Sequence, residues 1–314
     1  LDTSPRVVLV QNVGMFSVGK DLGAARIAGD LTETNAKVIS SVEETSAYTF
    51  IPEKDLFDVE YWSFEQAKIK KKKKILEGNV VVVTGATGTI GFETYKMFKS
   101  YGAEVVLLDN NLERLTEIQS KIKDLCMHCD VTNKKSVKNA FKQICEKFGG
   151  IDILVSNAGT APGGSIGEVS DEILRKSFEI NFFSHQNCAS EAVKIMKKQK
   201  NGVIINIAST YGIVAADQRI YGKSGQNSAV YYAATKSAII NFTRYLASYW
   251  RGTGIRVNTL SPGGVENNQG IEYLRRLASK QIFQMLPSTY LVEQSSDGEL
   301  HKLFQKQEQS SHNV

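Results

Sequence analysis

The sequence predicts a doubly wound α/β fold with an open parallel sheet, and three observations lead to this prediction. From residue 78 onward, short apolar segments alternate with longer segments of helical periodicity. The short segments are continuously apolar and rich in β-branched residues, which is typical of strands covered on both faces. A glycine-rich turn joins the first of them to the segment that follows. Strands that alternate with helices form right-handed βαβ units, and such units build a parallel sheet.

The elements of this region are expected in alternation along the chain. The strands are predicted at residues 79–84, 104–109, 152–156, 203–208 and 255–260. The helices are predicted at residues 90–101, 111–123, 133–147, 171–199 and 229–250. Another strand is expected where Cys126 and Cys129 lie. These cysteines have the spacing of a metal-binding pair, but no second pair accompanies them, so we expect buried thiols and no metal site.

The residues before this region form a different segment. Residues 1–67 carry more acidic than basic residues, and a run dominated by lysine follows from Lys68 to Lys74. No arginine or aromatic residue is interleaved with these lysines, so the run is interpreted as a solvated linker rather than a nucleic-acid-binding site. The elements expected before the run are a short buried strand at Val7–Val10 and helices at 20–46 and 55–70.

Composition places the chain among globular proteins of a reducing compartment. Its residues are 42% hydrophobic and 23% charged, and no run reaches the roughly 18 apolar residues of a membrane span. The first residues lack the basic and then apolar build of a signal peptide, and there are only 4 cysteines. We therefore expect a cytoplasmic protein with no membrane partner and no nucleic-acid partner.

The glycine-rich turn has the features of a dinucleotide-binding site. It reads TGATGTIG over residues 84–91, directly after the first strand and before the first helix of the region. Glycines let the backbone turn sharply and approach a pyrophosphate, and the helix N-terminus supplies free N–H groups. An acid, Asp109, ends the next strand, where it can bind both adenosine ribose hydroxyls and would repel a 2′-phosphate, so NAD is favoured over NADP. The turn residues expected to bind the cofactor are Gly85, Thr87, Gly88, Thr89, Ile90 and Gly91.

Two further strand ends point to the same crevice. Asp130 and Val131 follow the strand that holds the cysteine pair, and a carboxylate there can meet the adenine amino group. Asn157, Ala158 and Gly159 follow the strand at 152–156, and small residues let this loop pass close to a cofactor. Ligands of open α/β sheets bind beyond the carboxyl ends of the strands, so all these residues are expected to face one site.

A catalytic pair is expected at the start of the helix at 229–250. Tyr232 and Lys236 lie four residues apart and therefore share a helix face. A free tyrosine has a pKa near ~10, and a nearby ammonium together with a positive nicotinamide ring would stabilise its phenolate. Tyr232 could then exchange a proton with a substrate oxygen while a hydride moves to or from the nicotinamide. Ser209, which follows the strand at 203–208, could hydrogen-bond the same oxygen.

With these motifs in this order, residues 78–266 resemble a short-chain dehydrogenase/reductase with a Rossmann-like doubly wound parallel sheet. The resemblance implies that Tyr232 is the acid/base and that Ser209 orients the substrate. It also implies that Lys236 binds the nicotinamide ribose and that Asn181 holds a water in the proton relay. Cofactor contacts are further implied for Tyr232, Lys236, Pro262, Gly263 and Val265.

Two departures from the family pattern bear on the substrate. Thr89 stands where the short form of the family has a glycine, which leaves the G-x-x-G-x-x-G spacing of the extended form. The segment between Ser209 and Tyr232 is longer than usual and resembles the substrate loop of relatives that act on sugars or nucleotide sugars. The leading hypothesis is an NAD-dependent oxidoreductase acting on a sugar-like or small polyol substrate. A sugar-nucleotide epimerase with bound NAD remains an alternative.

The N-terminal residues resemble the end of a class II aldolase domain and its linker. The resemblance rests on PRVVLVQNVGMFSVGKDLGAARIAGDL and DLFDVEYWSFEQAK, as in proteins where such an aldolase precedes a short-chain dehydrogenase. The chain has only 4 histidines, and they are widely separated, so no aldolase activity is expected. The expected parts are an N-terminal α/β extension at 1–67, a lysine-rich linker at 68–77, an NAD-binding domain at 78–280 and an atypical tail at 281–314.

The tail at 281–314 departs most from the family. It lacks the V-T-G turn and the last strand ending in D-G-G that the resemblance leads us to expect. Family tetramers use that strand in their second interface, so we expect either a homodimer built from the helices at 171–199 and 229–250 or a poorly behaved monomer, rather than a stable tetramer. The missing edge strand also leaves open a second alternative, a nucleotide-binding protein without catalytic activity.

Overall fold

The computed structural model describes residues 5–19, 21–52, 55, 74–161, 163–165, 167–222 and 227–265. By their internal contacts the residues divide into two compact units. One unit is Leu1–Asn79 with Phe98–Glu104, and the other is Val80–Met97 with Val105–Val314. The predicted helix at 55–70, apart from residue 55, and the predicted tail at 281–314 lie outside the described residues.

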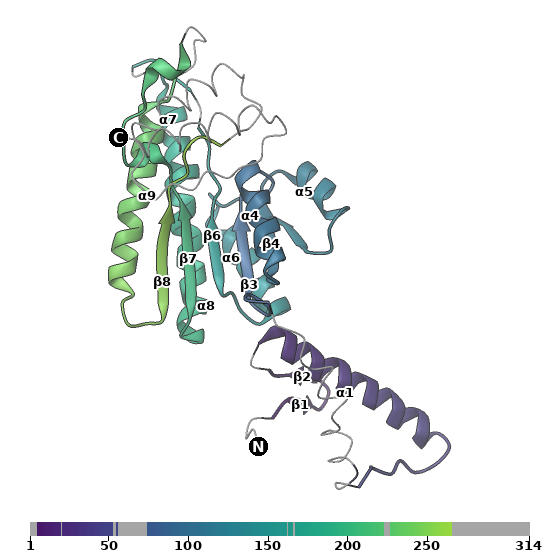
Figure 1. Cartoon of the computed structure of the whole chain (residues 1–314). Helices are drawn as coiled ribbons and strands as arrows, with labels where there is room; N and C mark the ends of the chain where they lie inside the picture. Colours follow the sequence, from purple (N-terminus) through teal and green to yellow (C-terminus); the bar gives the residue numbers. More distant parts are fainter. Residues whose placement is uncertain are drawn as a thin grey trace, which may run out of the picture. The chain divides into compact units, whose positions relative to one another are not determined.

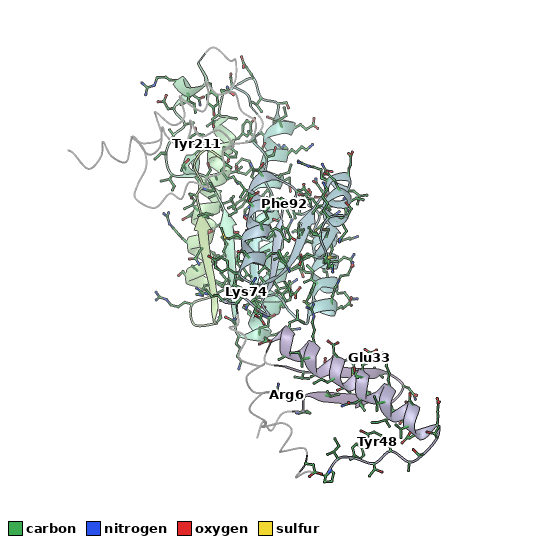
Figure 2. The ribbon with its side chains drawn as sticks, turned by 45° about the vertical axis from the view of Figure 1, so that its right-hand side comes forward. Arg6, Glu33, Tyr48, Lys74, Phe92 and Tyr211 are labelled. Atoms are coloured by element: carbon green, nitrogen blue, oxygen red, sulfur yellow. The ribbon has the colours of Figure 1, made fainter. Side chains whose placement is uncertain are left out.

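The described residues of the first unit form a hairpin and one long helix. Strands β1 (Val7–Val10) and β2 (Gly14–Ser17) pair antiparallel, and α1 spans Leu22–Glu43. Asp21 caps α1, because its side chain accepts a hydrogen bond from the Ala24 amide at 2.9 Å. Figure 2 labels Glu33 on this helix, where its carboxylate pairs with Lys37 at 2.8 Å.

The predicted strand at Val7–Val10 is confirmed, but its predicted burial is wrong. Leu9 is 74% exposed, and no residue of α1 is buried. An apolar run signals burial only when enough other elements surround it. A two-stranded hairpin with one helix has too little surface to enclose its own apolar side chains.

The second unit is built on a six-stranded sheet with helices on both faces (Figure 1). The strands lie in the order β5-β4-β3-β6-β7-β8, and β3 pairs parallel to β6 with Val81 beside Ile153. The predicted α/β fold with a parallel sheet is therefore confirmed. The strands are β3 (Val80–Thr84), β4 (Glu104–Asp109), β5 (Leu125–His128), β6 (Ile153–Ser156), β7 (Gly202–Ile207) and β8 (Ile255–Leu260).

The helices begin and end close to their predicted limits, with one exception. The helix predicted at 171–199 is interrupted by a π-helix, Glu179–Phe183, and so forms two α-helices. Two 3₁₀ turns, Thr210–Gly212 and Gln218–Tyr221, lie in the long segment after β7. The α-helices are α4 (Thr89–Ser100), α5 (Leu112–Gln119), α6 (Lys134–Phe148), α7 (Asp171–Phe178), α8 (Ser184–Gln199) and α9 (Val230–Tyr249). None of the described helices combines the length and the apolar character needed to cross a membrane.

The central strands form the core of this unit. Each valine from Val80 to Val83 is at most 2% exposed, and Val105–Leu108 of β4 are at most 1% exposed. Each fully buried side chain of this size contributes about 1.5–3 kcal/mol, which explains why continuous apolar runs form strands here rather than loops. The buried sheet thus gives the loops at its carboxyl end a rigid base.

The strand order determines where a ligand can enter. The chain passes from β3 outward to β4 and β5 and then returns to place β6 on the other side of β3. Adjacent loops after β3 and β6 therefore lead away from each other and leave a crevice between them. The glycine-rich turn follows β3, and Asn157 follows β6, so both border this crevice.

Candidate active site

A cavity of about 630 Å³ lies at the carboxyl ends of the strands and collects most of the residues singled out in the sequence. Gly91, Asn181 and Lys236 are not part of its lining and lie behind it, each of them buried. Figure 2 labels Phe92 on α4 and Tyr211 after β7, two elements that border this cavity. The lining residues that the sequence predicted are Gly85, Thr87, Gly88, Thr89, Ile90, Asp109, Asp130, Val131, Asn157, Ala158, Gly159, Ser209, Tyr232, Pro262, Gly263 and Val265.

The turn after β3 depends on glycine at two positions. Gly85 has a positive φ of 61°, and a Cβ atom there would lie 2.8 Å from the Cα of Ala158. A Cβ atom on Gly91 would lie 2.8 Å from the Cα of Ala86. Thr89, which replaces the expected glycine, is exposed at the first position of α4. The N–H groups of that helix end have no intrahelical acceptors and favour an anionic group, so the turn can hold a pyrophosphate.

Asp109 is held at the end of β4 by the same turn. Its Oδ2 accepts hydrogen bonds from the amide and the hydroxyl of Thr87, both at 2.9 Å, and its Oδ1 accepts one from the Asn111 amide at 3.0 Å. A carboxylate offers about four acceptor sites, so Oδ1 keeps one for a ligand hydroxyl. The contact with Thr87 was not foreseen, although Thr87 itself was expected at the site.

Asn157 ties the two sides of the crevice together. Its Nδ2 donates to the carbonyl oxygens of Thr84 and Gly85, both at 3.0 Å. The Thr84 hydroxyl in turn accepts from the amides of Asn157 and Ala158, at 3.0 and 3.1 Å. Asn157 therefore has a structural role in shaping the cofactor turn.

The three catalytic candidates come together on β7 and α9. Ser209 lies two residues beyond the end of β7, is 7% exposed, and hydrogen-bonds Tyr232. Lys236 lies one helical turn after Tyr232, with its Nζ 5.7 Å from the centre of the phenol ring. Lys236 is 4% exposed, and its Nζ donates to the carbonyl of Ile207 at 3.0 Å. The phenol and the hydroxyl thus line the cavity together, and the buried amine lies one helical turn further along α9.

The electrostatics of this group differ from the expectation. Burial lowers the pKa of Lys236 to about 8. Burial also raises the pKa of Tyr232, and its hydrogen bond with Ser209 opposes that rise only in part. The phenolate stabilisation expected from the Lys236 ammonium together with the nicotinamide ring is not seen in the chain alone, because Lys236 is directed to the Ile207 carbonyl and desolvation of the phenol outweighs the other influences. With the cofactor bound, it stays a prediction.

Asn181 lies in the π-helix and is completely buried. Its Oδ1 accepts from the Thr160 amide at 2.7 Å, and its Nδ2 donates to the Thr160 carbonyl at 2.9 Å and to the Thr235 hydroxyl at 3.2 Å. These bonds attach the loop after β6 to α9, so the side chain of Asn181 positions two cavity walls. Its expected role in holding a relay water stays a prediction. π-Helical turns occur often at functional sites because they redirect side chains.

Some site residues were not found from the sequence. Thr132 orients Asp130, since its amide and hydroxyl donate to Asp130 Oδ1 at 2.9 and 2.7 Å. A second cavity of about 640 Å³ adjoins this end of the site and includes Arg175 and Lys176 of α7. Asn206 is completely buried, and a lone amide in the apolar segment 203–208 was the one signal available for it. Within the described part of the chain, no three His, Cys, Asp or Glu side chains are placed to bind a metal ion.

Two family models match the chain. The model described as short chain dehydrogenase matches residues 79–275, which is more than half of the sequence. The model described as the second domain of class II aldolase matches residues 1–69. Both matches agree with the resemblances inferred from the motifs.

Individual proteins extend this comparison. An uncharacterized oxidoreductase of Bacillus subtilis, YuxG, is 27% identical over 279 residues, which is 86% of this chain but only 39% of that relative's length. The 3-oxoacyl-[acyl-carrier-protein] reductase FabG of Thermotoga maritima is 33% identical over 196 residues, 61% of this chain and 76% of the relative. A short chain dehydrogenase of Leptospira borgpetersenii, solved with bound NAD+, has a TM-score of 0.60 and 31% identity over 66% of this chain and 79% of its own. The fold, the motifs and the family match together show that the chain belongs to the short chain dehydrogenase family.

Proposed function

We propose that the chain is an NAD-dependent oxidoreductase that transfers a hydride between nicotinamide and a hydroxyl or carbonyl group of a sugar-like or small polyol substrate. The observation that carries this proposal is the position of Ser209 and Tyr232 in the same cavity as the glycine-rich turn and Asp109. A proton-transferring phenol and a dinucleotide-binding turn are thus within reach of one bound ligand pair.

The cavity fits a dinucleotide. The N-terminus of α4 would bind the pyrophosphate, and the free acceptor site of Asp109 would bind the ribose hydroxyls. Lys236 would bind the nicotinamide ribose, as the family resemblance implies. The NAD+ bound to the Leptospira relative supports this choice of cofactor. When bound, the nicotinamide supplies or accepts the hydride.

The residues of the chain supply the proton. Burial keeps Tyr232 protonated at neutral pH, and this is the form that can donate a proton to a carbonyl oxygen. The Ser209 hydroxyl can donate to the same oxygen and hold it in line with the phenol. In the oxidation direction, the Tyr232 phenol must first lose its own proton, and the phenolate then takes the proton from the substrate hydroxyl. The positive nicotinamide ring of bound NAD+ would stabilise that phenolate. Lys236, which has a pKa of about 8, can hold or release a proton beside the phenol near neutral pH.

The long segment between β7 and α9 supports a polar substrate. Tyr231 donates to the carbonyl of Gly163 at 3.0 Å, and Asn227 accepts from the Gly164 amide at 2.8 Å. The loop after β6 and the segment before α9 are therefore joined beside Tyr232. The polar substrate itself is proposed from the resemblance of this long segment to the substrate loop of relatives that act on sugars or nucleotide sugars.

The cysteines of the chain bear on the cellular compartment in which it works. The cysteines at 126, 129, 145 and 188 are free thiols. Free thiols persist in a reducing compartment, so we propose a cytoplasmic location.

An NAD-linked screen over sugars, sugar acids and polyols tests the proposed function. The wild-type chain should form NADH with at least one of these substrate classes. Tyr232→Phe should abolish that turnover and leave NADH binding nearly unchanged, because only the proton-transferring hydroxyl is lost. Substantial residual turnover by Tyr232→Phe would show that another group moves the proton. Conversion of a sugar nucleotide without net NADH release would instead favour the epimerase alternative.

A further inference from the structure

A buried polar cluster lies beneath the catalytic group and takes no part in the proposed chemistry. We name it the Asn206 clamp, and it consists of His185, Asn206 and Thr243. These side chains are 1%, 0% and 5% exposed and come from α8, β7 and α9. Burial of polar groups is costly unless they are hydrogen-bonded, so the arrangement of these bonds indicates what the cluster does.

The hydrogen bonds of the clamp determine its proton positions. The Thr243 hydroxyl donates to the Ile239 carbonyl at 2.9 Å, so it must accept from the Asn206 amide nitrogen, also at 2.9 Å. The Asn206 Oδ1 atom then faces His185 Nδ1 at 3.2 Å. An amide oxygen can only accept, so His185 Nδ1 carries a proton and donates it to Asn206.

The second ring nitrogen of His185, Nε2, does not need to carry a proton. His185 Nε2 has no hydrogen-bond partner among the residues that the structure describes. Burial first, and then the charge of Lys236, lower the pKa of His185 to about 3, while the hydrogen bond to Asn206 and, to the smallest extent, the nearby Ala158 backbone raise it. The imidazole is therefore neutral at working pH, in the Nδ1–H form.

The clamp is linked to the catalytic group through two elements. Asn206 precedes Ile207, whose carbonyl accepts the hydrogen bond from Lys236 Nζ at 3.0 Å. Thr243 lies seven residues after Lys236 on α9, which places both on the same side of that helix. The clamp and the Lys236–Ile207 bond therefore join β7 to α9 at two points. Ser209 is carried by the end of β7 and Tyr232 by the start of α9.

We propose that His185 is a positioning residue that, by donating its Nδ1 proton to Asn206, fixes the spacing between Ser209 on β7 and the Tyr232–Lys236 pair on α9. The proposal rests on the proposed function for the roles of those three residues. A cluster of apolar side chains would fill the same space but would not define the register between strand and helix. A shift of about 1 Å between reacting groups is enough to lower turnover greatly.

Two substitutions separate positioning from simple core packing. His185→Asn keeps a side-chain N–H near the place of Nδ1 and can still donate to Asn206. His185→Leu keeps the apolar volume but leaves Asn206 Oδ1 without its donor. Cys188→Ala, a buried change on α8 outside the clamp, is the matched control for a general disturbance of this helix.

The first readout is the tautomer of His185, measured by ¹⁵N NMR on histidine-labelled wild-type chain. The chain has 4 histidines, and the signal missing in His185→Asn identifies residue 185. We expect a protonated Nδ1 and an unprotonated Nε2 at pH 7. A proton on Nε2 would overturn the proposal whether or not the proposed enzymatic function is correct.

The second readout is the Kd for NADH, with kcat and KM for a substrate from the screen, each corrected for the folded fraction. His185→Leu should weaken NADH binding and lower kcat by about tenfold or more, with a smaller change in KM. His185→Asn and Cys188→Ala should stay within about threefold of wild type. Folded His185→Leu with wild-type NADH affinity and kcat would overturn the proposal. Failure of the wild-type chain to bind NADH would instead refute the proposed function and leave the tautomer as the test of the clamp.

Discussion

Lys236 is a buried amine whose charged form is costly to the fold. Its pKa is lowered from 10.5 to about 8 by burial, so the folded chain binds fewer protons than the unfolded chain between these values. The wild-type chain therefore gains stability as the pH rises through this window, and the cost is fully present below about pH 8. The site thus carries a cost in stability at neutral pH.

Replacement by methionine should reveal that cost. We expect Lys236→Met to raise the free energy of unfolding by up to about 3 kcal/mol at pH 7, the equivalent of the pKa shift, and to abolish turnover. The gain should shrink towards pH 10, because the wild-type lysine then loses its proton. Urea unfolding at pH 7 and pH 9.5 measures this difference. Lys138→Met, an exposed change on α6, is the control and should show no such pH dependence. A Lys236→Met chain that is less stable than wild type at pH 7 would contradict the argument.

Asp109 should decide between the two nicotinamide dinucleotides. Its remaining acceptor site would bind ribose hydroxyls, while its charge would repel a 2′-phosphate. We expect wild-type chain to bind NAD more tightly than NADP, and Asp109→Ala to reduce this preference by about tenfold or more. Asp130→Ala is the matched control, since it should weaken both cofactors alike. Titration of all three chains with both cofactors measures the preference, and an unchanged ratio in Asp109→Ala would contradict the assignment.

Residues that follow a strand could be identified from the sequence because the fold brings all strand ends to one edge. Gly85, Asp109 and Ser209 were found in this way. His185 and Thr243 were missed, because their role arises only when α8 and α9 pack on β7. The rise in the Tyr232 pKa in the chain alone was not foreseen for a similar reason. Neighbouring charges can be guessed from spacing, but the extent of burial cannot.

At the scale of elements, the turn from β3 to α4 depends on glycine at position 85 more than at position 88. Gly85→Ala should lower the free energy of unfolding by about 2 kcal/mol or more, because φ is positive there and the new Cβ would lie 2.8 Å from Ala158. Gly88→Ala is the matched control, since its Cβ would lie at an acceptable 3.4 Å from the Gly85 carbonyl. Chemical unfolding of both variants checks this. Equal losses would show that backbone conformation does not limit the turn.

The π-helix at Glu179–Phe183 illustrates what periodicity does not show. The residues 171–199 continue an amphipathic pattern, so one uninterrupted helix was predicted. A π-turn inserts a single residue into one turn, so the segments on either side of it are still predicted as helix. Its cause lies in the tertiary structure, because Asn181 bonds to Thr160 and Thr235, which belong to distant parts of the chain.

At the scale of the whole molecule, the strands and their parallel arrangement followed from the apolar runs and the alternation with helices. The first unit was less predictable, since Val7–Val10 has the same apolar character but lies exposed. The difference is one of context. A run such as Val80–Val83 has strands on both sides and helices above and below, whereas a hairpin offers one neighbour.

The exposed surface of α9 supports assembly into a homodimer. Tyr245 and Tyr249 are 62% and 66% exposed, and their rings stack with centres 5.8 Å apart. Phe183, just before α8, is 41% exposed. Tyrosine and phenylalanine are enriched in protein interfaces, and a two-fold axis would place each such patch against its own copy.

The exposed tyrosine pair of α9 should control the association of the chain. The wild-type chain should sediment as a dimer, and Tyr245→Glu combined with Tyr249→Glu should sediment as a folded monomer, because the dyad would bring the introduced charges of both copies together. Tyr101→Glu, which changes another exposed tyrosine, should leave the dimer intact. Sedimentation velocity at low micromolar concentration measures all three chains. A stable wild-type tetramer would show that the chain forms a second interface outside these helices, and a dimer that survives both glutamates would place the two-fold axis elsewhere.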